Sequence, residues 1–529
     1  MALALAVAMA FPVPAEAQEP LEPPVIEAVF PPGAWPGTPV SIQGRNFGAL
    51  QVPGLSRVTF NGVDAGTATL WSENYILVAV PGGATSGPVV VSTMLGDSNP
   101  YPFTVYEQEP QFTSYFAEGT TRAGFEEWLT ILNPYDSQYT ATVTYMVAQG
   151  ANRIRYYNLP ARSRVTVNVN SEIGSGRDVS LSVSAAQRLY AERSLYFDYG
   201  GSWKGGHCSV PATEASDRWY FAEGTTRAGF EEWLCLANPG AQEAQVTVRY
   251  CGATGEAMQQ DVLIAPRRRV SIDVNSAVGA EKDVALEIVS TQPIVAERPM
   301  YFAYRGAWDG GHITVGATET SDRWYFAEGT TRAGFEEWLC LANPGAQEAQ
   351  VTVRYCGATG EAMQQDVLIA PRRRVSIDVN SAVGAEKDVA LEIVSTQPIV
   401  AERPMYFAYR GAWDGGHITV GATETSDRWY FAEGTTRAGF EEWLCLANPG
   451  AQEAQVHIDY FFQGGEVQGQ DLHVQAGSRV TVYVNQAVGE GRDVAVKVSS
   501  QRGIVAERSM YFLYRGGWDG GHNTLGMNL

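Results

Sequence analysis

Hydrophobic and polar positions alternate along most of this chain with a period of two residues. Val246, Val248 and Tyr250 alternate with polar residues, as strands with one buried face do. Turn sequences such as Asn238-Pro239-Gly240 separate the apolar runs, and no stretch shows sustained helical periodicity. The pattern over 219–315 predicts strands at 219–222, 232–237, 244–251, 259–264, 269–274, 284–289, 294–304 and 312–315.

The same unit occurs four times. The string Tyr-Phe-Ala-Glu-Gly-Thr-Thr-Arg recurs every 105 residues, starting at Tyr115, Tyr220, Tyr325 and Tyr430. A closing Gly-Gly-His recurs at the same interval, ending at His207, His312, His417 and His522. The second and third copies are identical, since 216–351 matches 321–456. A unit of this length is the size of an autonomous domain, and its seven or eight short strands predict an antiparallel β-sandwich.

These marks divide the chain into six segments. We expect a signal peptide at 1–17, a separate domain at 24–106, and repeats at 112–215, 216–320, 321–425 and 426–529. The linkers Glu107–Gln111 and Ala317–Asp322 are short. Five domains of roughly 35 Å joined this way predict an articulated rod about 170 Å long.

Residues 24–106 have a pattern of their own. They begin with Pro24-Val-Ile-Glu-Ala-Val-Phe-Pro-Pro and continue with Gly37-Thr-Pro-Val-Ser-Ile-Gln-Gly-Arg-Asn-Phe-Gly48. This segment resembles the IPT/TIG domain over nearly its whole length. The resemblance implies an immunoglobulin-like sandwich, used for adhesion or as a spacer in exported bacterial proteins, without catalytic residues. The four later units resemble an uncharacterised repeat of secreted bacterial proteins. We therefore expect an all-β fold, a tandem array of an Ig-like IPT/TIG domain and four sandwich repeats of about 105 residues.

The first residues and the overall charge indicate location. The apolar run at 1–11 is followed by Ala15-Glu16-Ala17, which fits a signal-peptidase site, although no Lys or Arg precedes the run. No later stretch approaches the roughly 20 apolar residues of a membrane span. With 37 basic and 58 acidic residues the net charge is −21, which disfavours nucleic acid as a partner. We expect a secreted, extracellular protein, with cell-surface association as an alternative.

Six cysteines do not form a regular framework. Cys235 and Cys251 flank the turn Asn238–Glu243 and could face each other across a hairpin, and Cys340 with Cys356 repeats them. An exported protein can oxidise such pairs, so both are disulfide candidates. The first copy has Thr130 and Met146 at these positions, so the fold does not depend on the bridge. No C-x-x-C spacing indicates structural zinc.

One set of polar and aromatic residues recurs in every copy. Its members are the candidate binding residues, one set per repeat. In the first copy they are Glu118, Arg122, Glu126, Glu192, Arg193, Trp203 and His207, with Thr120, Thr121 and Glu127 beside them. In the fourth copy they are Glu433, Arg437, Glu441, Glu507, Arg508, Trp518 and His522.

Two interpretations of this set stay open. A binding site for extracellular polysaccharide or cell-wall material would use the Trp as a stacking platform and the carboxylates as hydroxyl acceptors. In the other interpretation the residues only hold the sandwich together. His207 with Glu118 or Glu126 could bind a metal, but we assign no metal and no cofactor. Calcium binding stays possible, although no calcium-binding motif is present in the sequence. A binder should expose the set in a concave patch, and a spacer should bury it.

Catalysis is not indicated. Glu126 and Glu127 are adjacent on a predicted strand, so their side chains point to opposite faces and cannot act as a pair. The G-x-S-x-G and H-E-x-x-H motifs are absent from the sequence. We predict a non-catalytic, multivalent binding or adhesion rod; a spacer without ligand is the alternative, and a hydrolase or its accessory module is the third.

Overall fold

The computed structural model describes residues 22–106, 111–252, 257–358, 360 and 362–528. The predicted signal peptide and most of the linker Glu107–Gln111 lie outside the described residues. The chain divides into two compact units, Met1–Glu109 and Pro110–Leu529.

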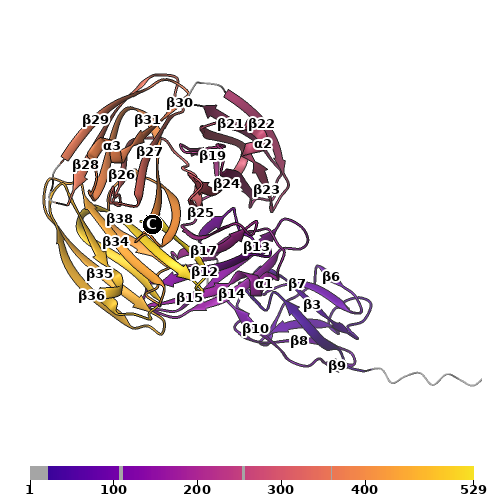
Figure 1. Cartoon of the computed structure of the whole chain (residues 1–529). Coiled ribbons are helices and arrows are strands. Elements are labelled where there is room, and N and C mark those ends of the chain that lie inside the picture. Colours follow the sequence, from indigo (N-terminus) through magenta and orange to yellow (C-terminus); the bar gives the residue numbers. More distant parts are fainter. Residues whose placement is uncertain (1–21, 107–110, 253–256, 359, 361, 529) are drawn as a thin grey trace, which may run out of the picture. The chain divides into compact units, whose positions relative to one another are not determined.

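The first unit is a sandwich of two small sheets, ordered β1-β3-β7-β6 and β2-β10-β8-β4-β5, with β9 beside β8 (Figure 1). Alternate residues such as Val40 and Ile42 in one sheet and Val89 and Val91 in the other are buried between them. The Ig-like fold expected for this segment is confirmed. Its strands are β1 Val25–Phe30, β2 Gly33–Ala34, β3 Pro39–Arg45, β4 Arg57–Phe60, β5 Val63–Asp64, β6 Leu70–Trp71, β7 Tyr75–Ala79, β8 Gly87–Thr93, β9 Gly96–Asp97 and β10 Tyr101–Val105.

Each repeat is a sandwich of two four-stranded layers. In the second repeat one layer contains β19, β21, β22 and the first half of β24, and the other contains β20, β23, β25 and the second half of β24. The elements are β19 Ser216–Phe221, β20 Phe230–Asn238, β21 Ala244–Gly252, β22 Ala257–Ile264, β23 Arg268–Asp273, α2 Val274–Val278, β24 Val284–Tyr304 and β25 Trp308–Val315. Trp219, Val248 and Ile288 are among the residues buried between the layers.

Two local features differ from the sequence prediction. The strands predicted at 284–289 and 294–304 are one strand, β24, which passes from one layer to the other. In the first repeat the same segment remains two strands, β16 Val179–Ala185 and β17 Tyr190–Tyr199. A single helical turn, α2, follows β23; Asp273 accepts a hydrogen bond from the Ser276 N–H, and Gly279 ends the turn at a φ of 81°. Five residues are too few to show helical periodicity in a sequence.

The other three repeats have the same element order. The first contains β11 Phe112–Phe116, β12 Phe125–Asn133, β13 Tyr139–Val147, β14 Arg153–Leu159, β15 Ser163–Asn168, α1 Val169–Ile173, β16 Val179–Ala185, β17 Tyr190–Tyr199 and β18 Trp203–Ser209. The third contains β26 Ser321–Phe326, β27 Phe335–Asn343, β28 Ala349–Gly357, β29 Ala362–Ile369, β30 Arg373–Asp378, α3 Val379–Val383, β31 Val389–Tyr409 and β32 Trp413–Val420. The fourth contains β33 Ser426–Phe431, β34 Phe440–Asn448, β35 Ala454–Phe462, β36 Val467–Val474, β37 Ser478–Tyr483, α4 Val484–Val488, β38 Val494–Tyr514 and β39 Trp518–Leu525.

Within the second unit the four repeats close into a ring (Figure 1). The last strand of each repeat packs on that of the next, from β18 through β25 and β32 to β39, and β39 packs on β18. The rod predicted from the short linkers is therefore wrong for the repeats. A linker's length limits the distance between domains but not the direction in which they follow each other. We call the contact between the fourth and first repeats the seam, and the other three contacts the internal junctions.

The Gly-Gly of the recurring Gly-Gly-His sequence explains how closely these strands meet. A Cβ on Gly310 would stand 3.1 Å from the Cα of Gly415, and one on Gly415 would stand 3.3 Å from the Cα of Gly520. On Gly520 it would stand 3.4 Å from the backbone nitrogen of Gly206. Glycine at this position lets four backbones approach one another at the centre of the ring.

Candidate functional site

The structure divides the predicted polar set among three places. The residues buried inside the ring are Glu192, Arg193, His207, Glu507, Arg508 and His522. On the flank of the repeats, Glu126 and Glu441 contact the neighbouring repeat, and Trp203 and Trp518 pack beside a tyrosine of their own last hairpin. Those that line pockets between repeats are Glu118, Arg122, Glu433 and Arg437.

Buried ion pairs join each repeat to the next. Glu297 Oε2 lies 3.0 Å from Arg193 Nη1, and both side chains are 0% exposed. The Glu118 N–H also donates to Glu297 Oε2 over 2.6 Å. The pair recurs as Arg298–Glu402, Arg403–Glu507 and, across the seam, Arg508–Glu192. Such pairs persist only where further hydrogen bonds compensate for lost hydration, and here they hold the ring together out of reach of a ligand.

The recurring histidines meet at the centre of the ring. The ring centroid of His207 lies 6.3 Å from that of His312 and 5.9 Å from that of His522. Burial, together with the nearby Arg193 guanidinium, lowers the pKa of His207 to about 3. Burial also lowers the pKa of His312, His417 and His522 well below 6.5, so the imidazoles are neutral at pH 7. No three His, Cys, Asp or Glu side chains group as metal ligands within the described residues.

The flank residues form a second layer of contacts. Tyr514 donates to Glu126 Oε2 over 2.8 Å across the seam, and Tyr409 donates to Glu441 Oε2 over 2.7 Å at an internal junction. Trp203 stacks on Tyr199 with ring centroids 6.0 Å apart. Adjacent glutamates do point to opposite faces, as predicted, because Glu127 is fully buried beside the partly exposed Glu126.

Glu127 is the most perturbed carboxyl in its repeat. Among the described residues, neither of its carboxylate oxygens has a hydrogen-bond partner. Burial raises its pKa to about 8, although the Arg193 guanidinium acts in the opposite direction. Burial raises the pKa of Glu232 and Glu442 equally to about 8, and that of Glu337 well above 4.5. These groups lie inside the sandwiches and do not line the pockets described next.

A pocket of about 230 Å³ lies between the first and second repeats. The first repeat contributes Glu118, Thr120, Arg122, Phe125, Asp178 and Tyr199, and the second contributes Trp233, Cys235, Arg269, Ser271, Pro299 and Tyr301. Neither repeat alone contains the site. The second and third repeats enclose an equivalent pocket of about 230 Å³ with every lining residue shifted by 105. The third–fourth junction carries closely similar residues at the corresponding positions.

Two ion pairs and two aromatic surfaces define this pocket. Arg269 Nη2 donates to Glu118 Oε2 over 2.5 Å, with both side chains nearly buried. At the rim Arg122 Nη2 donates to Asp178 Oδ2 over 2.5 Å, and the Arg122 side chain is 64% exposed. Tyr199 and Tyr301 stack with ring centroids 3.9 Å apart. The pocket therefore combines aromatic faces with paired donors and acceptors and has no net charge.

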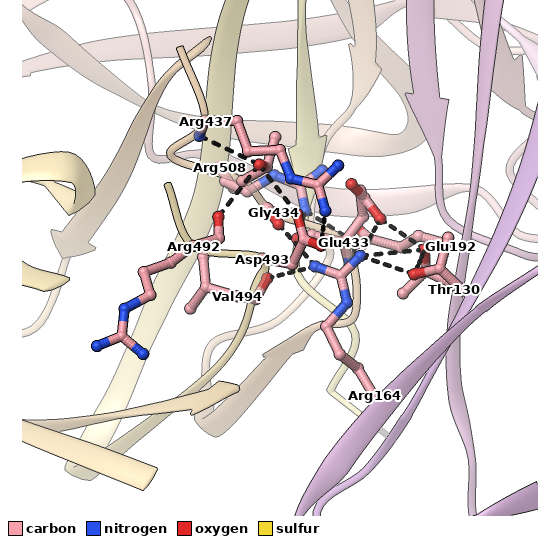
Figure 2. Close-up of polar contacts among 12 residues, drawn as sticks. Thr130, Arg164, Glu192, Glu433, Gly434, Arg437, Arg492, Asp493, Val494 and Arg508 are labelled. Carbon is pink, nitrogen blue, oxygen red and sulfur yellow. Dashed lines mark hydrogen bonds and ion pairs between the residues drawn. The ribbon is translucent and has the colours of Figure 1, made fainter. Parts of the chain in front are cut away.

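The seam encloses a pocket of about 320 Å³, larger than the pockets of about 230 Å³ at the first two internal junctions. Figure 2 shows Arg164 of the first repeat reaching into the loops of the fourth. Its Nη2 donates to Glu433 Oε2 and its Nη1 to the Gly434 carbonyl, each over 2.6 Å. Thr130 also donates to Glu433 Oε2, over 2.5 Å. The rim pair is Arg437 with Asp493, at 2.5 Å.

Three pocket-lining positions escaped the sequence analysis. They are the tryptophans Trp128, Trp233, Trp338 and Trp443, the arginines Arg164, Arg269, Arg374 and Arg479, and the tyrosines Tyr196, Tyr301, Tyr406 and Tyr511. All recur at the 105-residue interval, so the comparison of copies contains them. The comparison does not reveal that each pocket combines residues from two neighbouring copies.

The candidate disulfides are not formed. All six cysteines are free. Cys235 lies in β20, which pairs with β23 and β24, whereas Cys251 lies in β21, which pairs with β22 and β24. β20 and β21 belong to different layers, so the hairpin that the spacing suggested does not exist; the same holds for Cys340 and Cys356. Cys235 instead donates to Glu118 across the junction, over 2.6 Å.

Family models match most of the chain. The model of the family of unknown function DUF5719 matches residues 201–297, 310–402 and 415–508, and the IPT/TIG model matches 24–105. Each DUF5719 match begins in or near the last hairpin of one repeat and ends in the long strand of the next. None of the curated proteins matches significantly. Across the described residues, no helix has the length and apolar character of a membrane span.

Solved structures resemble only parts of the chain. Thermotoga maritima protein 1070 shares 17% identity, covering 20% of this chain and 94% of that one, with a TM-score of 0.19. The Anabaena sensory rhodopsin transducer shares 24% identity, covering 16% and 79%, with a TM-score of 0.15. An auxiliary nutrient-binding protein from Bacteroides ovatus shares 18% identity, covering 22% and 30%, with a TM-score of 0.14. At these TM-scores the likenesses carry no argument about function.

Proposed function

We propose that this chain, which belongs to the DUF5719 family of unknown function, is a non-catalytic, secreted binding protein whose ligands occupy the pockets between its repeats. Its modular architecture is an IPT/TIG domain followed by tandem repeats. The ligand class that we propose is neutral polysaccharide, free or in cell walls.

The recurrence of one pocket with one chemistry carries this proposal. The half-buried indole of Trp233 suits the apolar face of a pyranose ring. The Glu118–Arg269 and Arg122–Asp178 pairs present acceptors and donors side by side, which suits vicinal hydroxyls. A pocket without net charge favours a neutral ligand over a charged one.

The same contacts argue for binding without catalysis. Glu118 and Asp178 each accept hydrogen bonds from a guanidinium, as Glu433 and Asp493 do at the seam. A catalytic carboxyl group must lie within hydrogen-bond reach of a reacting atom, and guanidinium groups engage these carboxylates instead. Glu127, with its pKa of about 8, lies behind the pocket in the sandwich core.

Equivalent pockets around one ring allow multivalent binding. Linked sites raise the strength of attachment by roughly 10²–10⁴ without any new contact, provided that one ligand can reach two of them. The alternative of a spacer without ligand is favoured by one observation, the burial of Glu192, Arg193 and His207 inside the ring. Those residues serve ring closure under either function.

Co-sedimentation of the mature chain, 18–529, with insoluble polysaccharides and bacterial cell walls, with and without calcium, tests the proposal. We expect retention that decreases at least fivefold when Trp128, Trp233 and Trp338 are all replaced by alanine. Trp518→Ala is the matched control, because Trp518 packs at a tilted angle beside Tyr514 at the last hairpin and lines none of the described pockets. Equal retention of the triple variant, or no retention of the unsubstituted chain, would favour the spacer.

A further inference from the structure

The seam pocket differs from the first two internal pockets in its lining. Gln463 of the fourth repeat lines it, and the corresponding residue of the first repeat is Ala148. Ser194 lines it where Pro299 and Pro404 line the first two internal pockets, and the third junction has Ser509 at this position, so Gln463 is the residue that sets the seam apart from all three. The replacements add an amide and a hydroxyl and remove a rigid apolar ring. They accompany an increase in volume from about 230 to about 320 Å³.

The seam also differs in connectivity. Neighbouring repeats at each internal junction follow one another in the chain, whereas the fourth and first repeats do not. The seam depends on non-covalent contacts alone, among them Arg508 Nη1 to Glu192 Oε2 over 2.8 Å and the stack of Tyr190 on Tyr430 at 3.8 Å. A ligand in the seam pocket touches both the first and the fourth repeat. These are the two neighbours that no linker holds together when the ring opens.

From these two differences we infer that the seam pocket is the ring's selective site for a neutral glycan, and that glycan bound there holds the ring closed. The inference rests on the proposed function and adds a location and a consequence. The half-sites are Trp128, Arg164 and Ser194 on one side and Glu433, Arg437 and Gln463 on the other. Because neither side alone makes the complete site, a ligand that needs both binds the closed ring more tightly than the open one and shifts the equilibrium toward closure.

Two backbone amides report on this equilibrium. The Glu433 N–H donates to the Glu192 carboxylate across the seam. The Glu118 N–H donates to Glu297 Oε2 in the same way at the first internal junction. Hydrogen exchange at Glu433 therefore measures seam opening, and exchange at Glu118 is an internal reference in the same molecule.

The chain supplies its own control variants. Ser194→Pro with Gln463→Ala gives the seam pocket the residues found at the first two internal junctions, and Pro occurs at the equivalent strand position in β24 and β31. The reciprocal variant, Ala148→Gln with Pro299→Ser, gives the first internal pocket the seam residues. Neither variant changes an ion pair of the ring.

The experiment combines calorimetry with hydrogen exchange on the full chain. The probes are cellohexaose, chitohexaose, xylohexaose and maltohexaose. We expect one glycan to bind the seam at least tenfold more tightly than the internal pockets, and to slow exchange at Glu433 at least tenfold while leaving Glu118 unchanged. The Ser194→Pro/Gln463→Ala variant should lose both effects, and the reciprocal variant should gain a second tight site.

The outcomes separate this inference from the proposed function. Glycan binding of equal strength in the unsubstituted chain and in Ser194→Pro/Gln463→Ala would overturn the selectivity of the seam and leave the proposed function standing. Tight seam binding without slower exchange at Glu433 would overturn the coupling to closure. If no glycan binds and no polysaccharide retains the chain, the proposed function fails and the inference fails with it.

Discussion

The ion pair across the seam provides the sharpest test of the closed ring. Glu192 accepts hydrogen bonds from Arg508, at 2.8 Å, and from the backbone of Glu433, and its side chain is fully buried. Replacing one partner of a buried pair leaves the other charge uncompensated, at a cost of 3–5 kcal/mol. Glu192→Gln keeps the shape and one acceptor oxygen, so we expect the lower value, about 3 kcal/mol.

This cost should appear as opening of the seam. At 1.4 kcal/mol for each factor of ten, about 3 kcal/mol makes opening roughly 100-fold more frequent. Hydrogen exchange at the Glu433 amide should accelerate by that factor under native conditions. The hydrodynamic radius should increase in moderate urea before the repeats themselves unfold.

Glu297→Gln is the matched control at the first internal junction. It breaks the equivalent pair with Arg193, but the chain between the two repeats keeps them adjacent, so effective concentration opposes separation. We expect exchange at Glu118 to accelerate less than tenfold, with no change in hydrodynamic radius. Equal effects of the two substitutions, or less than a tenfold effect at Glu433 in Glu192→Gln, would refute the reasoning that the seam alone can open.

Three further predictions follow from the ring. Deleting 216–320 leaves three repeats joined by unchanged sequence and should make the chain self-associate more than the unsubstituted chain does, as light scattering after gel filtration would show; a compact monomer would contradict it. Stability should be greatest between about pH 4.5 and 6.5. Because the pKa of Glu127 and its equivalents is raised in the folded state, the free energy of unfolding falls as pH rises from 4.5 toward 8. Because the pKa of the buried histidines is lowered, the free energy of unfolding also falls as pH drops below 6.5. Urea midpoints at pH 3.5, 5.5 and 8.5 test this, and a highest midpoint at pH 8.5 would disprove it. Gly415→Ala should cost about 2 kcal/mol, because its Cβ would stand 2.8 Å from Phe407 Cζ and 3.3 Å from the Gly520 Cα; an unchanged urea midpoint would count against close packing around Gly415.

The sequence predicts the fold of one repeat better than the arrangement of four. The alternation of apolar residues such as Val246 and Val248 reflects which face of a strand is buried. The contacts that bury this face lie within one repeat, so the pattern predicts the fold of the repeat. Ring closure depends on contacts between residues more than 100 positions apart, such as Arg193 with Glu297. A recurring residue signals that its position matters in every copy, but not whether its partner lies in the same copy or the next.

The candidate site shows the same limit. Glu118 and Arg122 were identified because they recur, and they do line a pocket. His207 and Arg193 recur as strictly and are buried ring contacts. Trp233 and Arg269 recur too, but they belong to the second repeat and face Glu118 of the first. Recurrence selects residues under constraint, and only the arrangement of repeats separates those that face a pocket from those that close the ring.

The ring also explains why the outer copies differ from the inner two. On the first repeat Tyr190 and Leu132 face the seam where the second has Val295 and Ala237. On the fourth repeat Phe461 and Met527 face it, and the second has Cys251 and Ala317 in their places. Each replacement is larger, and together they form an apolar cluster that includes the Tyr190–Tyr430 stack.

Matched enlargement on two surfaces that are far apart in the sequence is what selection for contact between them would produce. It gives the first and last copies a specific closing partner, which disfavours pairing of either with an inner copy. The closed geometry also bears on the identical second and third copies. Four Gly-Gly segments meet around the axis, and a chain with one copy fewer would have to turn further at every junction to bring its seam surfaces together. The exact duplication therefore supplies a copy that the closed geometry of this ring uses.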